Sequence, residues 1–219
     1  ATGERRILGL ELAAGNDEGN AWAPFLRGLV ERGLAGVRLA ISDAHRGLVV
    51  AIRETLLGAA WQRCRVHFTR NAQGLVPRGA AGMVASAIRS IFEQLDETAA
   101  SGQLRRVADG LAARFPAVAE LLTDAEPDLL VHFTFPEAHR RQLRSTNPLE
   151  RLNKEIKRRT AVVGIFPTRA SLIRLVGMVL FEQDDEWQDG RRYFSPESMA
   201  QIDAPVDRQE VSPALLIAS

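Results

Sequence analysis

Two carboxylates have sequence surroundings that suit chemistry on a phosphate backbone. Asp43 directly follows Val37–Ser42, a short apolar run of the kind that forms a buried strand. A carboxylate at the carboxyl end of a parallel strand lies where α/β sheets hold ligands and catalytic groups. Glu150 leads Lys154 and Lys157 at spacings that place all three on one face of a helix. Such a face suits metal-dependent chemistry on DNA, because the acid holds a divalent cation while the lysines follow the phosphates.

Each carboxylate also has a purely structural interpretation. Ser42 or Asp43 could cap the helix that is predicted to follow, and such caps are more common than catalytic acids. The order Asn147, Pro148, Glu150 fits a helix start, with the Asn as N-cap, the Pro at the first position and the Glu at the third. That arrangement is a capping box, which needs no catalysis. Both interpretations stay open on these residues alone.

Cys64 and His67 have the C-x-x-H spacing of half a zinc site. The other histidines, His45, His132 and His139, do not form a matching second half, so a structural zinc ion is not expected. A packed cysteine and a hydrogen-bonded histidine near the sheet edge are favoured instead. Because Cys64 is the only cysteine, an intramolecular disulfide is excluded and a reducing, cytoplasmic compartment is indicated.

The overall composition is that of an ordinary globular protein, with 46% hydrophobic and 25% charged residues. No apolar run approaches the ~18 residues that a membrane span needs, so no membrane partner is expected. The net charge of +1 conceals a strong segregation. Residues 138–174 hold ten Lys or Arg against two acids, net +8, whereas residues 182–219 hold nine acids against three Arg, net −6. A basic block of that density attracts polyanions.

The elements that must position these residues begin as an alternation of strands and helices. Strands are predicted over Arg6–Ala13, Val37–Ser42 and Trp61–Val66, and amphipathic helices over Asn20–Arg32 and His45–Leu57. Strands that alternate with helices in this way indicate an α/β sheet with parallel neighbours.

After residue 70 the helical period dominates. The segment Leu129–Phe135 is ambiguous between a strand and a buried helix, and its helical neighbours favour a helix. The tail beyond Gly190 has no periodicity and several prolines, so loose order is expected there. The remaining predicted helices cover residues 80–95, 103–113, 115–123, 148–160 and 169–186.

Three separated motifs together closely resemble the Mutator-type transposases of bacterial insertion sequences. The motifs are Ile41–Leu48 (ISDAHRGL), Cys64–Asn71 (CRVHFTRN) and Arg144–Arg151 (RSTNPLER), and the resemblance runs from about Ile7 to Trp187. It implies a DDE transposase with a ribonuclease H-like core, interrupted by an all-helical insertion between the second Asp and the final Glu. Asp43 is then the second acid of the triad, Glu150 the third, and Cys64 with His67 the family's C-x-x-H motif beside the active site.

The same resemblance implies a division of the chain. Residues 1–70 would be the first part of the core, 71–146 the helical insertion, 147–187 the C-terminal core helices, and 188–219 a loosely ordered acidic tail. The first acid of the family lies on a strand upstream of everything here, so the chain resembles a transposase truncated at its N-terminus, and we expect it to have little or no activity alone.

The family chemistry is DNA cleavage and strand transfer with two Mg²⁺ (or Mn²⁺) ions, and the two-metal site would be incomplete in this chain. Expected partners are transposon ends, target DNA and further copies of the chain. Two alternatives stay open: a non-catalytic DNA-binding or oligomerising fragment that modulates a full-length transposase, and a stand-alone ribonuclease H-like nuclease. The residues expected to supply the DNA-facing charge are Arg140, Arg141, Arg144, Arg151, Lys154, Lys157, Arg158, Arg159 and Arg169.

Overall fold

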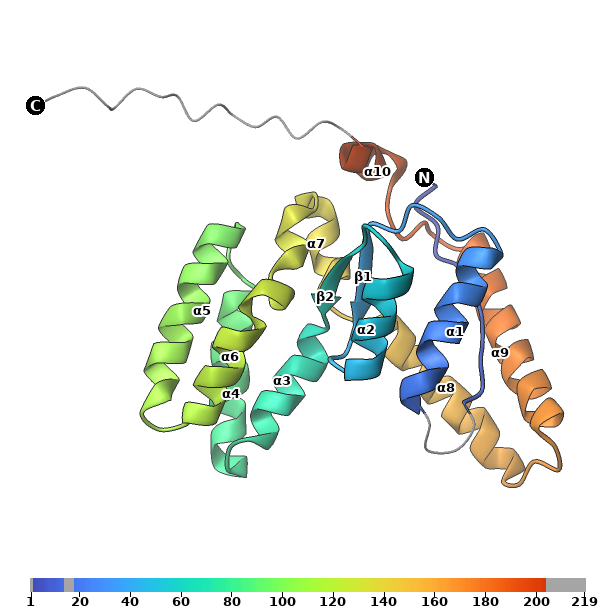
Figure 1. Cartoon of the computed structure of the whole chain (residues 1–219), viewed down its shortest axis with the longest axis horizontal. Coiled ribbons are helices and arrows are strands. Elements are labelled where there is room, and N and C mark those ends of the chain that lie inside the picture. The colour runs from blue at the N-terminus through green and yellow to red at the C-terminus, as the bar shows by residue number, and fades with distance from the viewer. Residues whose placement is uncertain (1, 14–17, 204–219) are drawn as a thin grey trace, which may run out of the picture.

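The computed structural model of the chain describes residues 2–13 and 18–203. Over these residues the protein is a mixed α/β structure, mostly helical, with one small sheet (Figure 1). No described helix is both long enough and apolar enough to cross a membrane. The elements in chain order are α1 (Glu18–Glu31), β1 (Leu39–Ser42), α2 (Arg46–Thr55), β2 (Ala60–Arg63), α3 (Arg65–Gly74), α4 (Arg78–Ile91), α5 (Glu97–Ala112), α6 (Pro116–Leu129), the 3-10 turn η1 (Val131–Thr134), α7 (Glu137–Leu143), α8 (Asn147–Val163), α9 (Arg169–Asp189) and α10 (Pro196–Asp203).

Two parallel strands form the sheet of the described chain. They pair in register from Leu39 opposite Ala60 to Ser42 opposite Arg63. Helix α2 makes the crossover between them, as parallel neighbours require. The predicted parallel pair is therefore confirmed, although the strand expected over Trp61–Val66 is shorter, because α3 begins two residues after β2 ends.

The strand predicted over Arg6–Ala13 is wrong, since that segment has no regular secondary structure. Its backbone groups bind side chains in place of a neighbouring strand. The N–H of Ile7 donates to the carboxylate of Asp184 at 2.6 Å, and the carbonyl of Leu8 accepts from the Arg32 guanidinium at 2.8 Å. An apolar run becomes a strand only where its backbone finds a ladder partner, and here the segment lies against α1 and α9 instead (Figure 1).

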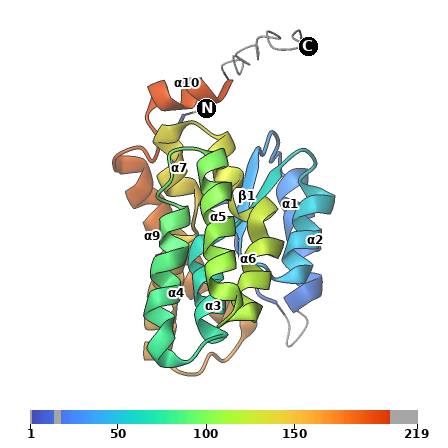
Figure 2. The same ribbon diagram turned by 90° about the vertical axis from the view of Figure 1, so that its left-hand side faces the viewer.

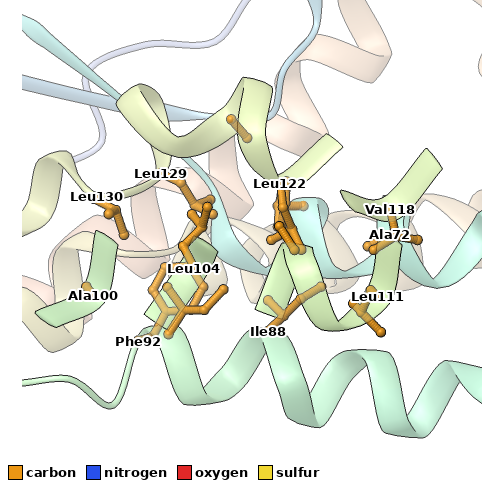
Figure 3. Close-up of a cluster of buried hydrophobic side chains, with 14 of the residues drawn as sticks. Ala72, Ile88, Phe92, Ala100, Leu104, Leu111, Val118, Leu122, Leu129 and Leu130 are labelled. Atoms are coloured by element: carbon orange, nitrogen blue, oxygen red, sulfur yellow. The ribbon is translucent and has the colours of Figure 1, made fainter. Parts of the chain in front are cut away.

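The helices predicted after residue 70 are present, and the first three of them share one large hydrophobic core with α3. Helices α3, α4, α5 and α6 stand together as a layer beside the sheet (Figure 2). Figure 3 shows the interior of this core, where Ile88, Leu104, Val118 and Leu122 are fully buried. The ambiguous segment Leu129–Phe135 contains the last residue of α6 and the 3-10 turn η1. The helical interpretation is therefore confirmed, and the strand is excluded.

A buried glutamine joins the sheet to this helical layer. Gln62 on β2 is fully buried, and its amide donates to the carbonyl of Leu129 at 2.9 Å. Its side-chain oxygen accepts from the backbone N–H of His132 at 2.8 Å. Because a buried amide must find partners, these bonds fix β2 against the end of α6 and the start of η1.

Two smaller cores complete the described chain. Leu26, Leu29, Ile52 and Trp61 pack α1 and α2 onto the sheet. Helices α8 and α9 pack through a separate cluster that is centred on Leu152, Val176 and Leu180. The side of the sheet that carries α1 and α2 and the helical layer of α3 to α6 are therefore stabilised by different apolar clusters.

The described part of the tail contains a helix, where the sequence predicted loose order. Residues 196–203 form helix α10, and the Ser198 hydroxyl lies 2.8 Å from Nε2 of the buried His139. The backbone N–H of Phe194 donates to the carbonyl of Gly3 at 3.0 Å, which ties the tail to the start of the described chain. Loose order is therefore wrong for this stretch, because α10 finds a packing partner on α7. The expectation for residues 204–219 lies outside the described residues.

Candidate functional site

Asp43 lies at the carboxyl end of β1 and is half-buried. One of its carboxylate oxygens accepts the backbone N–H of His45 at 3.3 Å. His45 is itself the N-cap of α2, and its ring accepts the N–H of Leu48 at 3.4 Å. The Ser42 hydroxyl donates to the carbonyl of Asp43 at 2.7 Å. The predicted cap by Ser42 or Asp43 is therefore wrong, because the helix starts too late for either side chain to reach its first turn.

Glu150 does not form the predicted capping box. Helix α8 begins at Asn147, so Thr146 takes the N-cap position and no side chain caps the helix. Glu150 consequently lies one position deeper than a capping box requires, and its carboxylate turns toward α3. There one oxygen, Oε2, lies 3.2 Å from Nη2 of Arg70, and the other, Oε1, lies 3.7 Å from Nδ1 of His67.

Cys64 is fully buried at the junction of β2 and α3. Its sulfur accepts the backbone N–H of Thr146 at 3.4 Å and lies 3.3 Å from the Thr146 hydroxyl. Burial raises the pKa of the thiol, but the hydrogen bonds from Thr146 and from the backbone of His67 outweigh burial, so the pKa of Cys64 lies below its ordinary value. The cysteine is packed, as the sequence predicted, and its hydrogen bonds also favour the thiolate form.

Cys64, His67 and Glu150 form a three-residue cluster. One ligand atom from each, a sulfur, a ring nitrogen and a carboxylate oxygen, all lie within 4.8 Å of one another. Nδ1 of His67 and Oε1 of Glu150 are buried without a hydrogen-bond partner, because their separation of 3.7 Å is too long for a bond. Sequence reasoning missed that Glu150 joins the C-x-x-H pair, since the spacing of cysteines and histidines does not indicate a carboxylate from another helix.

The two predicted catalytic carboxylates share a cavity of about 400 Å³. Asp43, His67 and Glu150 lie on its wall, together with apolar side chains of α1 and α2. The carboxyl end of β1 and the first turns of α3 and α8 therefore meet here. Residues that are far apart in the sequence are brought to one site because both strands end on this side of the sheet.

Several of the predicted DNA-facing arginines are used within the protein. Arg140 donates to the carbonyl of Leu95 at 2.7 Å, and Arg144 donates to that of Phe92 at 3.1 Å. Burial lowers the pKa of Arg144. Arg169, at the first position of α9, pairs with an acid of the N-terminal segment at 3.1 Å. These guanidinium groups tie segments together, so only part of the +8 charge is free to face a ligand.

The exposed face of α8 divides into paired and unpaired cations. Arg158 and Arg159 both bind Glu155, at 2.6 and 2.8 Å, and their hydrogen bonds lower the pKa of that carboxyl to about 2. Lys154 and Lys157 are exposed and form no ion pair with any other described residue. Together with the exposed Arg151, the two lysines are therefore the cations of α8 that no described acid pairs.

Arg141 and Arg151 line a second cleft, of about 420 Å³, at the junction of α7 and α8. Arg5 joins them there, with its guanidinium carbon 4.0 Å from the ring centroid of Trp187 and 4.8 Å from that of Tyr193. Nε of Arg5 is buried and has no hydrogen-bond partner. Sequence reasoning missed Arg5, because it lies far from the basic block along the chain.

The chain matches known proteins over most of its length. Residues 1–190 match the family described as Transposase, Mutator family. The chain is 49% identical over 210 residues to the transposase for insertion sequence element IS1081 of Mycobacterium tuberculosis, which covers 96% of this chain and 50% of the relative. It is 44% identical to the transposase for IS406 of Burkholderia multivorans, over 89% of this chain and 50% of that protein.

A more distant relative agrees with these two. The transposase for IS256 in transposon Tn4001 of Staphylococcus aureus is 37% identical over 88% of this chain and 50% of its own length. The chain thus spans about half the length of the curated relatives that it matches. Since the family match covers far more than half of the residues, and the motifs around Asp43, Cys64 and Glu150 fall inside it, the chain belongs to the Mutator family of transposases.

Proposed function

We propose that this chain contributes two metal-binding carboxylates to a transposase that cleaves DNA and transfers its strands by phosphoryl transfer. The observation that carries the proposal is the shared cavity, whose wall holds both Asp43 and Glu150. Divalent-metal enzymes of this kind need carboxylate oxygens gathered at one open site. Two acids from distant parts of the chain are gathered in that way here.

The residues present fit a Mg²⁺ or Mn²⁺ ion. Oε1 of Glu150 is a buried carboxylate oxygen without a partner, and such an oxygen is costly unless something positive meets it. Oδ1 of Asp43 accepts one backbone N–H, from His45, so this oxygen still has a lone pair for a metal ion. Asp43 and Glu150 would hold the ion, and the bound ion would activate the attacking oxygen and stabilise the leaving one.

The neighbours of these carboxylates hold them in place before any ion binds. Arg70 engages Oε2 of Glu150 at 3.2 Å and leaves Oε1 free. The backbone N–H of His45 holds Asp43 in the turn between β1 and α2. Pre-positioned ligands lose little conformational freedom on binding, and this supports a site built for an ion.

The cations that adjoin the cavity suit a DNA backbone. Lys154 and Lys157 continue along α8 from Glu150 and are exposed. On the neighbouring surface, Arg5, Arg141 and Arg151 converge on one cleft. Guanidinium groups bind phosphate in a planar, bidentate manner. We propose that α8 follows the phosphates of a DNA strand whose scissile bond lies at the cavity.

We further propose that the sheet belongs to a ribonuclease H-like core. The parallel unit β1–α2–β2 places an acid at a strand end, and α8 brings the last acid beside it. The helical layer of α3 to α6, followed by α7, lies between these two parts in the sequence. This order supports the arrangement implied by the family motifs, with the helical layer inserted before the final Glu.

The test is metal-dependent cleavage and joining of DNA that carries insertion-sequence ends. It uses the complete gene product that carries these residues, whether or not it extends beyond the 219 residues. Asp43→Asn and Glu150→Gln should each lower the cleavage rate more than about 100-fold, because each removes charge that stabilises the transition state. Asp109→Asn and Glu120→Gln, exposed acids on the helical layer, are the matched controls and should have no effect.

Two results would contradict the proposal. Cleavage that persists at its full rate in Glu150→Gln would leave the cavity without a catalytic role. Cleavage that proceeds equally well in a chelator would show that no divalent ion takes part.

A further inference from the structure

We infer that Cys64, His67 and Glu150 form a zinc-binding site that shares Glu150 with the proposed catalytic site. The sequence shows only half of a zinc motif, whereas the structure supplies a third ligand from another helix. Three protein ligands with an exchangeable fourth position are typical of open zinc sites, in contrast to closed structural sites with four.

The separations between the ligand atoms suit a single ion. Zinc binds sulfur at about 2.3 Å and nitrogen or oxygen at about 2.0–2.2 Å, so tetrahedral ligand atoms lie roughly 3.3–3.7 Å apart. Nδ1 of His67 and Oε1 of Glu150 are 3.7 Å apart, and one ligand atom from each of Cys64, His67 and Glu150 lies within 4.8 Å of the other two. Displacements of about 1 Å in these side-chain atoms would bring the sulfur, the nitrogen and the oxygen to zinc-ligand distances.

The two buried atoms without partners give an independent reason to expect an occupant. Nδ1 of His67 and Oε1 of Glu150 face each other but cannot form a hydrogen bond at their distance. Unpaired buried polar atoms are rare because each costs about 1–3 kcal/mol. A cation between the nitrogen and the oxygen satisfies both atoms at once.

The donor types decide which cation fits. A thiolate and an imidazole are ligands for zinc and similar transition metals, whereas Mg²⁺ prefers oxygen alone. The Cys64 sulfur already accepts a backbone N–H from Thr146, which is the kind of hydrogen bond that orients a metal-bound thiolate. The cluster therefore selects zinc, and the pair Asp43 and Glu150 selects magnesium.

The helices that carry the ligands are fixed to each other. The backbone N–H of Arg65 at the start of α3 donates to the carbonyl of Arg144, just before α8, at 2.9 Å. Cys64 is joined to Thr146 through the sulfur. His67 and Glu150 also lie on the cavity wall, which gives an ion and its fourth ligand a route from solvent.

A shared ligand makes the two metals competitors, and this consequence rests on the proposed function. Glu150 cannot direct Oε1 to a zinc ion and to the magnesium site at the same time. Zinc should therefore inhibit Mg²⁺-dependent cleavage, and added Mg²⁺ should relieve the inhibition. The Cys64–His67 pair would then act as a zinc-sensitive brake on the catalytic acid.

The decisive experiment measures metal binding without DNA, so it does not depend on catalysis. The chain, freed of metal with a chelator, is titrated with Co²⁺, which reports tetrahedral thiolate ligation by a charge-transfer band and intense visible bands. We expect one Co²⁺ per chain, and full loss of the bands when Zn²⁺ is added. Absence of the charge-transfer band in the folded wild-type chain would overturn the inference.

Variants identify the ligands. His67→Asn and Glu150→Gln should each weaken Zn²⁺ binding more than about 100-fold, since changes to residues that merely orient ligands already cost 10–100-fold. His45→Asn is the matched control. It replaces an exposed histidine by an asparagine that can still cap α2, so the Zn²⁺ affinity of this variant should stay within about threefold of wild type. Cys64→Ser should abolish the charge-transfer band, and circular dichroism shows whether each variant folds.

Equal Zn²⁺ affinity in His67→Asn and in the wild type would also overturn the inferred zinc site. If Co²⁺ binds as expected but stoichiometric Zn²⁺ leaves Mg²⁺-dependent cleavage unchanged, the shared role of Glu150 is wrong. If no cleavage is found under any condition, the proposed function fails while the binding data still decide the zinc site.

Discussion

Acidification should destabilise the protein through one buried histidine. His132, in η1, is 1% exposed, and its ring centroid lies 5.8 Å from that of Phe92 and 4.3 Å from that of Phe133. Burial, and next the positive charge of Arg144, lower the pKa of His132 from 6.5 to about 4. The imidazolium form is disfavoured here because it would lose water and face guanidinium groups.

The sign and size of the effect follow from proton linkage. The unfolded chain takes up a proton near pH 6.5, whereas the folded chain resists it until about pH 4. Between these values the unfolded state binds more protons, so this contribution is fully present above pH 6.5 and is lost as the pH falls toward 4. At about 1.4 kcal/mol per pKa unit, the contribution to the free energy of unfolding is about 3 kcal/mol.

Urea denaturation, followed by circular dichroism between pH 7 and pH 4, measures this loss. The wild type should lose about 3 kcal/mol more than His132→Gln over that range, because the variant has no proton to take up at that position. Exposed His45 provides the control, since His45→Asn should follow the wild-type curve. Parallel curves for wild type and His132→Gln would refute the reasoning, as would an NMR titration that places the pKa of His132 near 6.5.

Three further predictions concern the buried Gln62 between the sheet and the helical layer, the core of that layer, and the lysines of α8. Gln62→Leu should lower the free energy of unfolding by about 2–5 kcal/mol in urea denaturation, because it leaves a buried carbonyl and a buried N–H without partners. Leu122→Ala should cost a similar 2–5 kcal/mol in the same measurement, since it opens a cavity in the fully buried core of α3 to α6. Changing both Lys154 and Lys157 to Ala should reduce the salt dependence of duplex binding by roughly one unit of slope per lost phosphate contact, and Arg106→Ala should leave it unchanged. An unchanged slope in the double variant would mean that α8 does not face DNA.

Much of the fold could be predicted from periodicity alone. The long amphipathic segments, such as those of α4 and α8, have enough turns for the helical spacing of apolar residues to be unambiguous. The parallel pair was equally readable, because two short apolar runs are separated by an amphipathic helix. The failure at Arg6–Ala13 has a different cause, since periodicity cannot show that the side chains of Asp184 and Arg32 take the backbone groups that a ladder would use.

The residue types of the candidate site were predictable, and the family motifs predicted that Asp43 and Glu150 share it, but the direct contact of Glu150 with the C-x-x-H pair was not predicted. The position of Asp43 at a strand end follows from the chain order, and the structure agrees. The association of Glu150 with Cys64 and His67 depends on how the first turn of α8 meets that of α3, which no local pattern encodes. Arg5 likewise joins Arg141 and Arg151 only through the packing of the N-terminal segment.

A single position excludes the capping-box interpretation of Glu150. A capping box would have used its carboxylate on the backbone of its own helix. Because α8 begins one residue earlier than predicted, Thr146 takes the N-cap position, and its hydroxyl lies against the Cys64 sulfur without capping the helix. The uncapped helix start is a cost of roughly 1 kcal/mol, and it leaves Oε1 of Glu150 free to meet a cation. The unpaired carboxylate oxygen is a further unfavourable term in this structure, and the proposed metal ion would offset it.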